Sequence, residues 1–452
     1  MKENHFLGEL SERERRSHKK GWGKILCFFL LAPFLICFPS SEGFCDVVPG
    51  DVIDDTNWDK AQGLVQEEVL EYVKEGKLVL RIEALSYDPG QHLPSYALEA
   101  MKTNRGKYDL DEDDWIVEKE TGKKTERILG HPFPIIDPED PRAATKIMYN
   151  TKYWQFVQGS LRGPLVQAYL SPRGYLRGVA AFNVNLYMDG NPEAIARPNP
   201  DRVMKYQITR ATSPYDIAGT AVLTYRYRDP KVEDNSFAYV PAIRRVRRMT
   251  PANRSDGMMG SDMAVDDAGM YDGKVTAMKW RFLRKEERLV PFVGKDPERI
   301  VPTEDGEWAT TEYITEIVFG YEKKGWQGAP WAPLNFIWVK RPVYVIEVTP
   351  KDPYYNYGTQ LIWVDTENWC PVHKTINDRA GKFWKFTLHA EMNYESEDKS
   401  VKIHSAGNQI VVDKRNKRST VSLPATSTDI WTYYARTDRD TFSLAGFQKF
   451  CK

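Results

Sequence analysis

The sequence predicts a mainly β protein of the α+β class, built on one large curved antiparallel sheet, a half-barrel, with helices covering its concave face. Three observations predict it. Apolar and polar residues alternate with a period of two in about ten segments, most of them after Gly178. Short turn-like joints separate the segments, as in a meander rather than in βαβ units. Two stretches, 56–75 and 152–170, are the helices available to cover the sheet, which must curl because strand twist accumulates.

The first half of the chain supplies few of these strands. Residues 55–76 show apolar positions on one helical face, with Gly63 as a break and Gly76 as the stop. A first strand is expected over 78–87. Residues 89–177 are an irregular inserted region rich in Glu, Asp, Lys, Gly and Pro, in which only 152–170 has helical apolar content.

The remaining strands follow the period-two pattern closely. In residues 384–394, aromatic and aliphatic side chains alternate with Lys385, Thr387, His389 and Glu391. The cleanest hairpin runs from 361 to 372, with its turn at 365–368. The strands expected in order are 182–188, 223–228, 275–282, 313–321, 343–348, 360–364, 372–376, 384–394, 409–413 and 419–423.

The N-terminus follows the pattern of a secretory signal peptide. Lys19, Lys20 and Lys24 precede the apolar run 25–38, and small polar residues follow. The run is shorter than the ~18 residues of a dependable membrane span. We therefore expect residues 1–45 to be removed, and 46–452 to form a single domain in the periplasm; the alternative is an uncleaved anchor.

Composition and motifs argue against several function classes. The 63 basic and 63 acidic residues balance, which disfavours a nucleic-acid partner. The acidic stretch 256–272 lacks the spacing of an EF-hand and is expected to be a solvated loop. His389 and Glu391 complete no zinc motif, and no nucleophile elbow is present. We expect a non-enzymatic protein with no catalytic residue, no cofactor and no metal.

Two cysteines lie well beyond the signal peptide. In an oxidising compartment, Cys370 and Cys451 are candidates for a disulfide, which would close a loop of about 80 residues. Two separate buried thiols are the alternative, because the sequence does not show that the two residues are close in space.

Three segments resemble one bacterial family. They are SPYDIAGTAVLTYRYRDPKVEDNSFAYVPAIRRVRRM (213–249), GSDMAVDDAGMYDGKVTAMKWRFL (260–283) and residues 341–386, which contain VDTENWCPV. The chain is similar to an outer-membrane lipoprotein-sorting-like family, domain of unknown function number thirteen twenty-nine. Its fold is similar to that of the lipoprotein carriers LolA and LolB.

The resemblance implies a function but no catalytic residues. It implies a Gram-negative periplasmic protein, with outer-membrane association an open question, that carries a lipid, a lipoprotein acyl chain or another hydrophobic molecule. An RND-type inner-membrane exporter or an outer-membrane protein is the implied partner. The alternatives are a β-rich envelope hydrolase acting on glycan or lipid, and an adaptor of an export complex that binds no ligand.

Two groups of residues are the candidate site. The predicted ligand-binding face consists of aromatic residues at alternate strand positions, namely Tyr225, Tyr227, Trp280, Phe282, Trp384 and Phe386. The densest basic cluster is Arg244, Arg245, Arg247 and Arg248. It is either an anion clamp at the mouth of the cavity or a set of structural ion pairs across the sheet.

Overall fold

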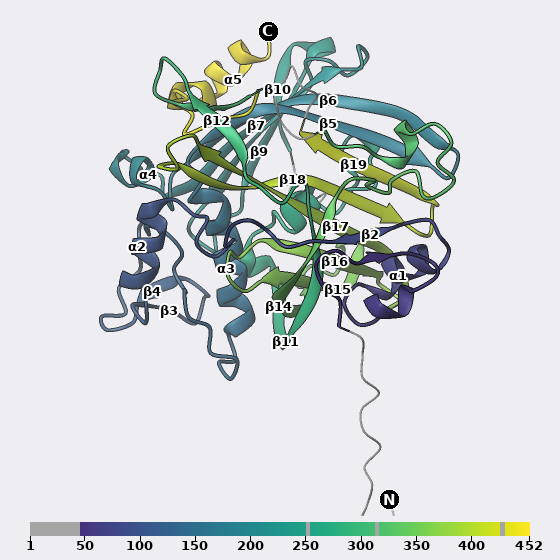
Figure 1. Ribbon diagram of the computed structural model, residues 1–452. Coiled ribbons are helices and arrows are strands. Elements are labelled where there is room, and N and C mark those ends of the chain that lie inside the picture. Colours follow the sequence, from purple (N-terminus) through teal and green to yellow (C-terminus); the bar gives the residue numbers. More distant parts are fainter. Residues whose placement is uncertain (1–45, 250–253, 312–315, 425–429) are drawn as a thin grey trace, which may run out of the picture. The chain divides into compact units, whose positions relative to one another are not determined.

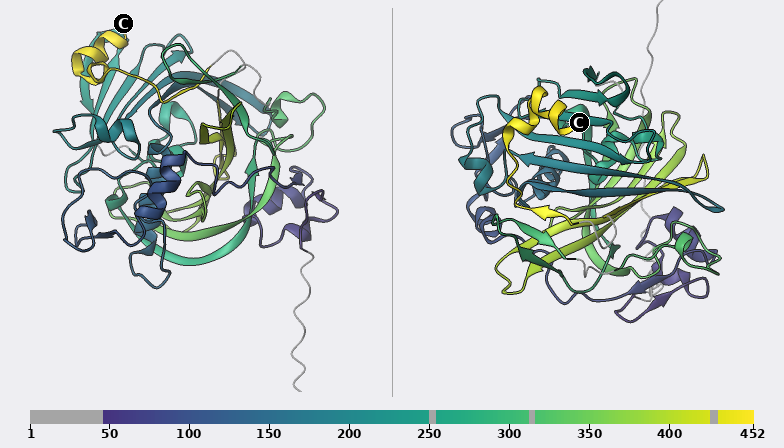
Figure 2. Two further views of the ribbon diagram at one scale, coloured as in Figure 1. Left: turned by 60° about the vertical axis from the view of Figure 1, so that its left-hand side comes forward. Right: turned by 90° about the horizontal axis from the view of Figure 1, so that it is seen from above.

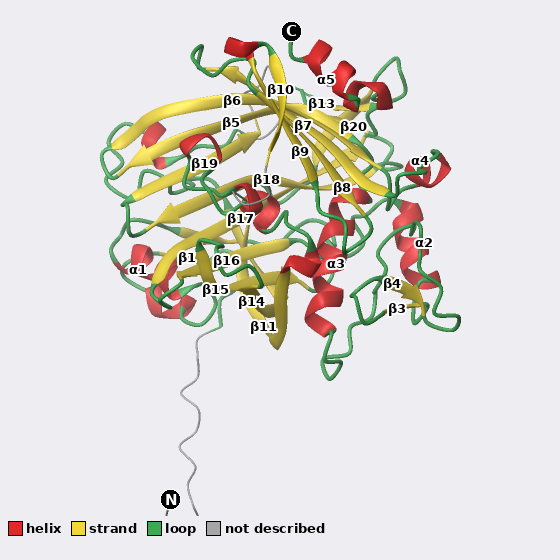
Figure 3. Cartoon of the chain, turned by 180° about the vertical axis from the view of Figure 1, so that it is seen from behind, coloured by secondary structure: helices red, strands yellow, loops and turns green. Residues whose placement is uncertain are grey.

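The alternating segments form one 18-stranded sheet, drawn in Figures 1 and 3. The structure is a computed structural model, and it describes residues 46–249, 254–311, 316–424 and 430–452. A small second sheet pairs β3 (Tyr108–Leu110) with β4 (Ile116–Glu118). The strands of the main sheet are β1 (Val52–Ile53), β2 (Leu80–Ile82), β5 (Leu161–Ser171), β6 (Gly174–Tyr187), β7 (Val203–Ser213), β8 (Ala221–Tyr227), β9 (Asn235–Val240), β10 (Arg245–Met249), β11 (Met278–Phe292), β12 (Glu298–Pro302), β13 (Trp308–Thr310), β14 (Ile337–Pro350), β15 (Tyr357–Asp365), β16 (Pro371–Asp378), β17 (Phe383–Ser396), β18 (Lys402–Asp413), β19 (Arg418–Pro424) and β20 (Thr432–Tyr433).

A continuous antiparallel ladder carries the main sheet. It runs β10–β9–β8–β7–β6–β5–β19–β18–β17–β16–β15–β14–β11. The end of β11 returns to pair with β17, Phe292 facing Glu391, so the ladder curls back on itself. Figure 2 shows the strands curving round. The predicted mainly β class with a curved antiparallel sheet is confirmed.

The helices are short. They are α1 (Glu67–Lys74), α2 (Ser95–Thr103), α3 (Ala143–Phe156), α4 (Pro192–Ala196) and α5 (Leu444–Phe450), with 3-10 turns η1 (Trp58–Ala61), η2 (Pro241–Ile243), η4 (Met258–Gly260), η5 (Val265–Met270), η6 (Val275–Ala277), η7 (Gly320–Glu322) and η8 (Arg439–Phe442). Within the described ranges, no helix combines the length and apolar character that crossing a membrane requires.

Two helices pack on opposite faces of β17. Tyr72 of α1 contacts Phe386 at 6.1 Å between ring centroids. Trp154 of α3 contacts His389, the residue of opposite parity on the same strand, at 5.8 Å. Helices α1 and α3 therefore do not share one face: α3 covers the polar face of β17, and α1 closes an apolar core on the other.

Several boundaries differ from the expected ones. The first helix is divided at Gly63, as expected, because this glycine has φ +76°. The helix expected over 152–170 is wrong, since α3 ends at Phe156 and β5 starts at Leu161. Residues 89–177 are not irregular throughout, because they hold α2, β3, β4, α3 and β5. The strand expected over 313–321 falls partly outside the described residues; its end is the turn η7.

Candidate functional site

A cavity of about 220 Å³ lies between the sheet and α3. Strands β5, β6 and β7 line it with residues that share one face of each pleated strand: Leu161 and Leu165, then Asn183 and Asn185, then Lys205 and Gln207. Strands β18 and β19 form another wall. Helix α3 covers the cavity with Trp154 and Gln155, and Gln158 follows the end of the helix. Ala268 and Gly269 from η5 complete the cover.

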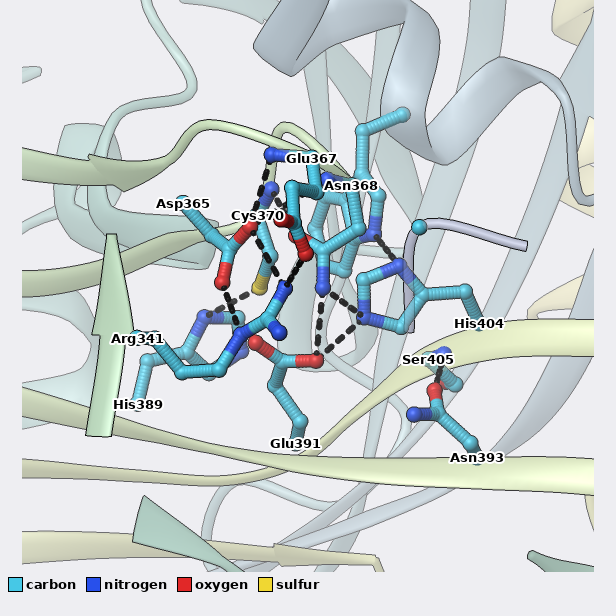
Figure 4. Close-up of polar contacts among 12 residues, drawn as sticks. Arg341, Asp365, Glu367, Asn368, Cys370, His389, Glu391, Asn393, His404 and Ser405 are labelled. Carbon is cyan, nitrogen blue, oxygen red and sulfur yellow. Dashed lines mark hydrogen bonds and ion pairs between the residues drawn. The ribbon is translucent and has the colours of Figure 1, made fainter. Parts of the chain in front are cut away.

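A buried polar cluster adjoins this cavity, and Figure 4 shows it. We define the cluster as Asn368, Cys370, His389, Glu391 and His404. The cavity wall includes the two histidines. Glu391 and His404 lie 2.6 Å apart, Oε2 to Nε2, and Asn368 donates a hydrogen bond of 3.0 Å to the same Glu391 oxygen. Cys370 Sγ lies 3.7 Å from His389 Nδ1.

The tight hairpin between β15 and β16 places two of these residues. Asp365 accepts hydrogen bonds from the backbone N–H groups of Glu367 and Asn368, an Asx turn that Asp favours. Trp369 takes φ +65°, and Asn368 Oδ1 accepts a hydrogen bond from Cys370 N–H. The segment VDTENWCPV therefore aims Asn368 and Cys370 at β17 and β18.

Cys370, Glu391 and His404 bring three metal-binding atoms within 4.8 Å of one another. The hydrogen bonds, however, already assign the lone pairs of His404. An indole N–H can only donate, so Trp154 Nε1 donates to His404 Nδ1 at 2.9 Å, and the ring proton of a neutral His404 sits on Nε2, facing Glu391. A metal ligand needs that Nε2 lone pair. The arrangement fits a hydrogen-bonded relay better than a metal centre.

Beside the cluster, one arginine pairs with the carboxylates of the hairpin between β15 and β16. Arg341 donates hydrogen bonds to both oxygens of Asp365 and one to Glu367. Burial raises the pKa of Asp365 in spite of this contact. Burial also opposes ionisation of Glu391, but His404, Arg341 and Asn368 outweigh it and hold the pKa of that carboxyl below its usual value.

Cys370 is placed as a core thiol and not as a nucleophile. Burial raises its pKa well above the usual value, and the negative charges of Glu391 and Asp365 add to the effect. A nucleophilic cysteine instead needs a lowered pKa and an electropositive setting. The contact with His389 does not supply one, because burial lowers the pKa of that imidazole.

The acidic stretch 256–272 is not the solvated loop expected from its composition. Asp266 and Asp267 are buried. Asp266 pairs with Arg254 at 2.5 Å and Asp267 with Lys374 at 2.6 Å. The sequence could not show this for Asp267, because Lys374 lies 107 residues away along the chain.

The six predicted ligand-binding aromatics do not come together on one surface. Phe386 belongs to the core beneath α1. Trp280, Phe282 and Trp384 pack in a second core. Tyr225 and Tyr227 pack against a third, which includes Phe442 and Phe447, and line a separate pocket. None of the six belongs to the lining of the cavity beneath α3.

The arginine cluster lies on an exposed strand at the sheet margin. Arg245, Arg247 and Arg248 are on β10, which pairs with β9, and Arg244 precedes it with φ +48°. All four are exposed, and Arg248 donates to Asn235 Oδ1 at 2.6 Å. None of them lines the cavity.

The structure contradicts the predicted disulfide. Cys370 and Cys451 are both free and buried. They sit in separate cores, Cys370 beside α3 and Cys451 at the end of α5. The open alternative of two separate thiols is the one observed.

Fold and site together define a class, a β protein built on one large sheet with a cavity of mixed polarity. The sequence matches the family described as "Protein of unknown function (DUF1329)" over residues 52–448, so the chain belongs to that family, as its motifs predicted.

Solved structures resemble the chain at low identity. One is a domain described as that of an outer membrane lipoprotein-sorting protein from Vibrio parahaemolyticus (16% identity, TM-score 0.46, covering 68% of this chain and 100% of that one). Another is a DUF1329 family protein from Desulfovibrio piger ATCC 29098 (15%, 0.43, 68% and 98%). A third is a LolA superfamily protein from Nitrosomonas europaea (14%, 0.39, 66% and 97%). No curated protein matches the sequence.

Proposed function

We propose that this protein is a non-enzymatic periplasmic carrier that holds one amphipathic molecule in the cavity beneath α3. The observation that carries the proposal is the cavity itself. Its wall combines Leu161, Leu165 and Met263 with the amides of β6 and β7. Binding sites for small molecules are concave and largely preformed, with apolar walls and a few placed polar groups.

The volume of the cavity limits how much of a ligand it can hold. About 220 Å³ is less than the roughly 300–1,000 Å³ typical of pockets for drug-sized ligands. A head group or one end of a lipid matches this space, and a whole lipid does not. This differs from the expected aromatic groove for an acyl chain, because the aromatic faces are used for packing.

The chemistry of the cluster supports a carrier over a hydrolase. The Cys370 thiol has a raised pKa, and Glu391 is engaged by His404 and Asn368. Neither group is therefore poised to attack a substrate.

The proposal also includes secretion of the protein and delivery of its ligand. The order of Lys24, the apolar run 25–38 and the small residues before Cys45 supports secretion. In the envelope, an RND-type exporter or an outer-membrane protein would exchange the ligand. N-terminal sequencing of the exported protein should find a start between Gly43 and Val47, and an intact Met1 would contradict it.

Filling the cavity tests the carrier function. Gln207 lines the cavity from β7, whereas Thr212 is exposed on the same strand. Gln207→Trp should abolish saturable binding of a fluorescent long-chain amphiphile, and Thr212→Trp should leave it unchanged. Circular dichroism and a melting curve confirm that both variants fold. A folded wild type that binds no amphiphile contradicts the proposal.

A further inference from the structure

Four amide side chains face the cavity without a protein partner. They are Gln155 of α3, Asn183 and Asn185 of β6, and Gln207 of β7. Asn185 and Gln207 are directly opposite in the ladder, and Asn183 is on the same face two residues away. Within the described part of the chain, none of these side chains makes a hydrogen bond or an ion pair.

Two further polar atoms of the wall are buried and unpaired. Asn408 uses its NH₂ group on Ser422 O, and its Oδ1 is left without a partner among the described residues. The same holds for the indole N–H of Trp431. Asn408 itself is 3% exposed. Both residues line the cavity.

The buried atoms of this set, Asn183 Oδ1, Asn408 Oδ1 and the indole N–H of Trp431, are costly unless something binds them. A buried amide without a hydrogen bond loses the free energy of its hydration, and an aliphatic residue of similar shape would avoid that loss. Here the unpaired donors and acceptors gather in one place that has room for another molecule. A ligand carrying both hydroxyl donors and hydroxyl acceptors would pair with them.

The charges of the wall are neutralised internally. Lys205 lies 2.7 Å from Asp272, which also accepts a hydrogen bond from Arg226. His404 is tied to Glu391 and Trp154. The wall therefore offers an ionic head group no free counter-charge, while the rings of Tyr187, Trp431 and Tyr433 supply the flat amphipathic surfaces that suit a polyol or a sugar.

We infer that the head group held in this cavity is uncharged and polyhydroxylated, as a sugar ring is. The inference rests on the proposed carrier function and names the chemistry of its ligand. The same chemistry could come from a free saccharide or from the head of a glycolipid.

Competition among ligands with one shared tail tests the inference. Dodecyl maltoside, dodecanoate and dodecyltrimethylammonium are compared as competitors of the fluorescent amphiphile on the wild-type protein, below their micelle concentrations. Dodecyl maltoside should act at roughly 10-fold lower concentration, because several hydrogen bonds of modest net strength add up. Equal or better displacement by dodecanoate would overturn the inference and leave the carrier function intact. No binding of any amphiphile would overturn both.

Maltose alone separates the two sources. Displacement by free maltose at similar concentration supports a saccharide ligand. Displacement by dodecyl maltoside only supports a glycolipid head, because the tail then adds necessary binding free energy.

Paired variants locate the recognition. Asn183→Leu with Asn185→Leu keeps the side-chain volume similar and removes the hydrogen-bonding groups. The double variant should bind dodecyl maltoside roughly 10-fold more weakly, and dodecanol as tightly as before or more so. Gln91→Leu, at an exposed loop position, is the control and should change neither. Equal loss for both ligands would overturn the assignment of these amides to the head group.

Discussion

The two faces of β17 are both buried, yet they differ completely in chemistry. On one face Phe386, Leu388 and Met392 pack under α1 in an apolar core. On the other face every residue is polar, and α3 and η5 cover it: Lys385, Thr387, His389, Glu391 and Asn393 are each 5% exposed or less. A polar face is usually a solvent face. Here it is a second interior, which holds ion pairs, the relay of Glu391 and His404, and the wall of a cavity.

The comparison separates packing from function along a single strand. The apolar face supplies stability through close contact and leaves no room for a ligand. The polar face holds its charges in fixed positions and leaves a space between the sheet and its cover. Substitutions on the two faces should therefore have different signatures.

Truncation on the apolar face should have the largest effect on stability. Phe386 is fully buried, with Tyr72 and Trp331 against its ring at 6.1 and 5.5 Å. Phe386→Ala should lower the free energy of unfolding by about 3–5 kcal/mol, measured by urea denaturation. Thr387→Val, on the next residue, removes an unpaired buried hydroxyl. Its effect should stay within about 1 kcal/mol of zero, and similar losses for both variants would contradict the contrast.

On the polar face, the corresponding disruption is a buried carboxylate that has lost its ion-pair partner. Lys374, opposite Thr387 in the ladder, pairs with Asp267, and both side chains are 0% exposed. Lys374→Met leaves that carboxylate uncompensated and should destabilise the fold by about 3 kcal/mol or more. Adding Asp267→Asn should recover part of the loss. If the double variant is less stable than Lys374→Met, the charge is not the cause.

Acid should weaken the fold through buried histidines. Burial lowers the pKa of His131 to about 3 and that of His92 to about 4, both below the usual value of 6.5 for histidine. The unfolded chain therefore takes up these protons first, so stability is full above about pH 6.5 and falls as the pH drops toward the folded values. Between about pH 7 and 4.5 each histidine should cost roughly 2–3 kcal/mol.

A neutral replacement isolates one histidine in that decline. His131 has no hydrogen bond to either ring nitrogen within the described residues. His131→Phe should flatten the decline of unfolding free energy with falling pH, as followed by urea titrations. An unchanged slope would mean that His131 is already protonated in the folded protein.

The smallest expected effect concerns the chemical reactivity of the two buried thiols. Burial raises the pKa of both cysteines, that of Cys451 to about 11 and that of Cys370 well above its usual value. Neither should react with iodoacetamide in the folded protein near neutral pH, and both should react after unfolding without reductant. If Cys370 and Cys451 both resist labelling in denaturant, they are joined by a disulfide, and this would contradict the structure.

The sequence predicted the curved sheet and many of its strands, but not the cavity beneath α3. Period-two alternation predicted β17 and the two sets of residues on its faces, because the face that packs in an apolar core has an apolar residue at every second position. It could not show that the polar side is buried too, since the cover, α3 and η5, comes from segments more than 100 residues away. Buried aromatics such as Trp280 and Phe386 carry the same pattern whether they line a cavity or fill a core.

The hairpin 365–372 shows where a local signal was available. Asp365, Asn368 and Cys370 were read as a turn and its return strand, which the structure confirms. Their position against Glu391 and His404 depends on the pairing of β16 with β17 and of β17 with β18. Two polar residues spaced by two on one face, such as Asn183 and Asn185 in the mostly apolar segment 178–187, are the local signal in the sequence for this wall of the cavity.

Native mass spectrometry of the protein purified without detergent tests the central claim most directly. The wild type should carry a non-covalent adduct of one amphipathic molecule, released on unfolding and replaced when dodecyl maltoside is added. Gln207→Trp should show the mass of the polypeptide alone, and Thr212→Trp should keep the adduct. A folded wild type that has only the polypeptide mass and takes up no amphiphile would contradict the account.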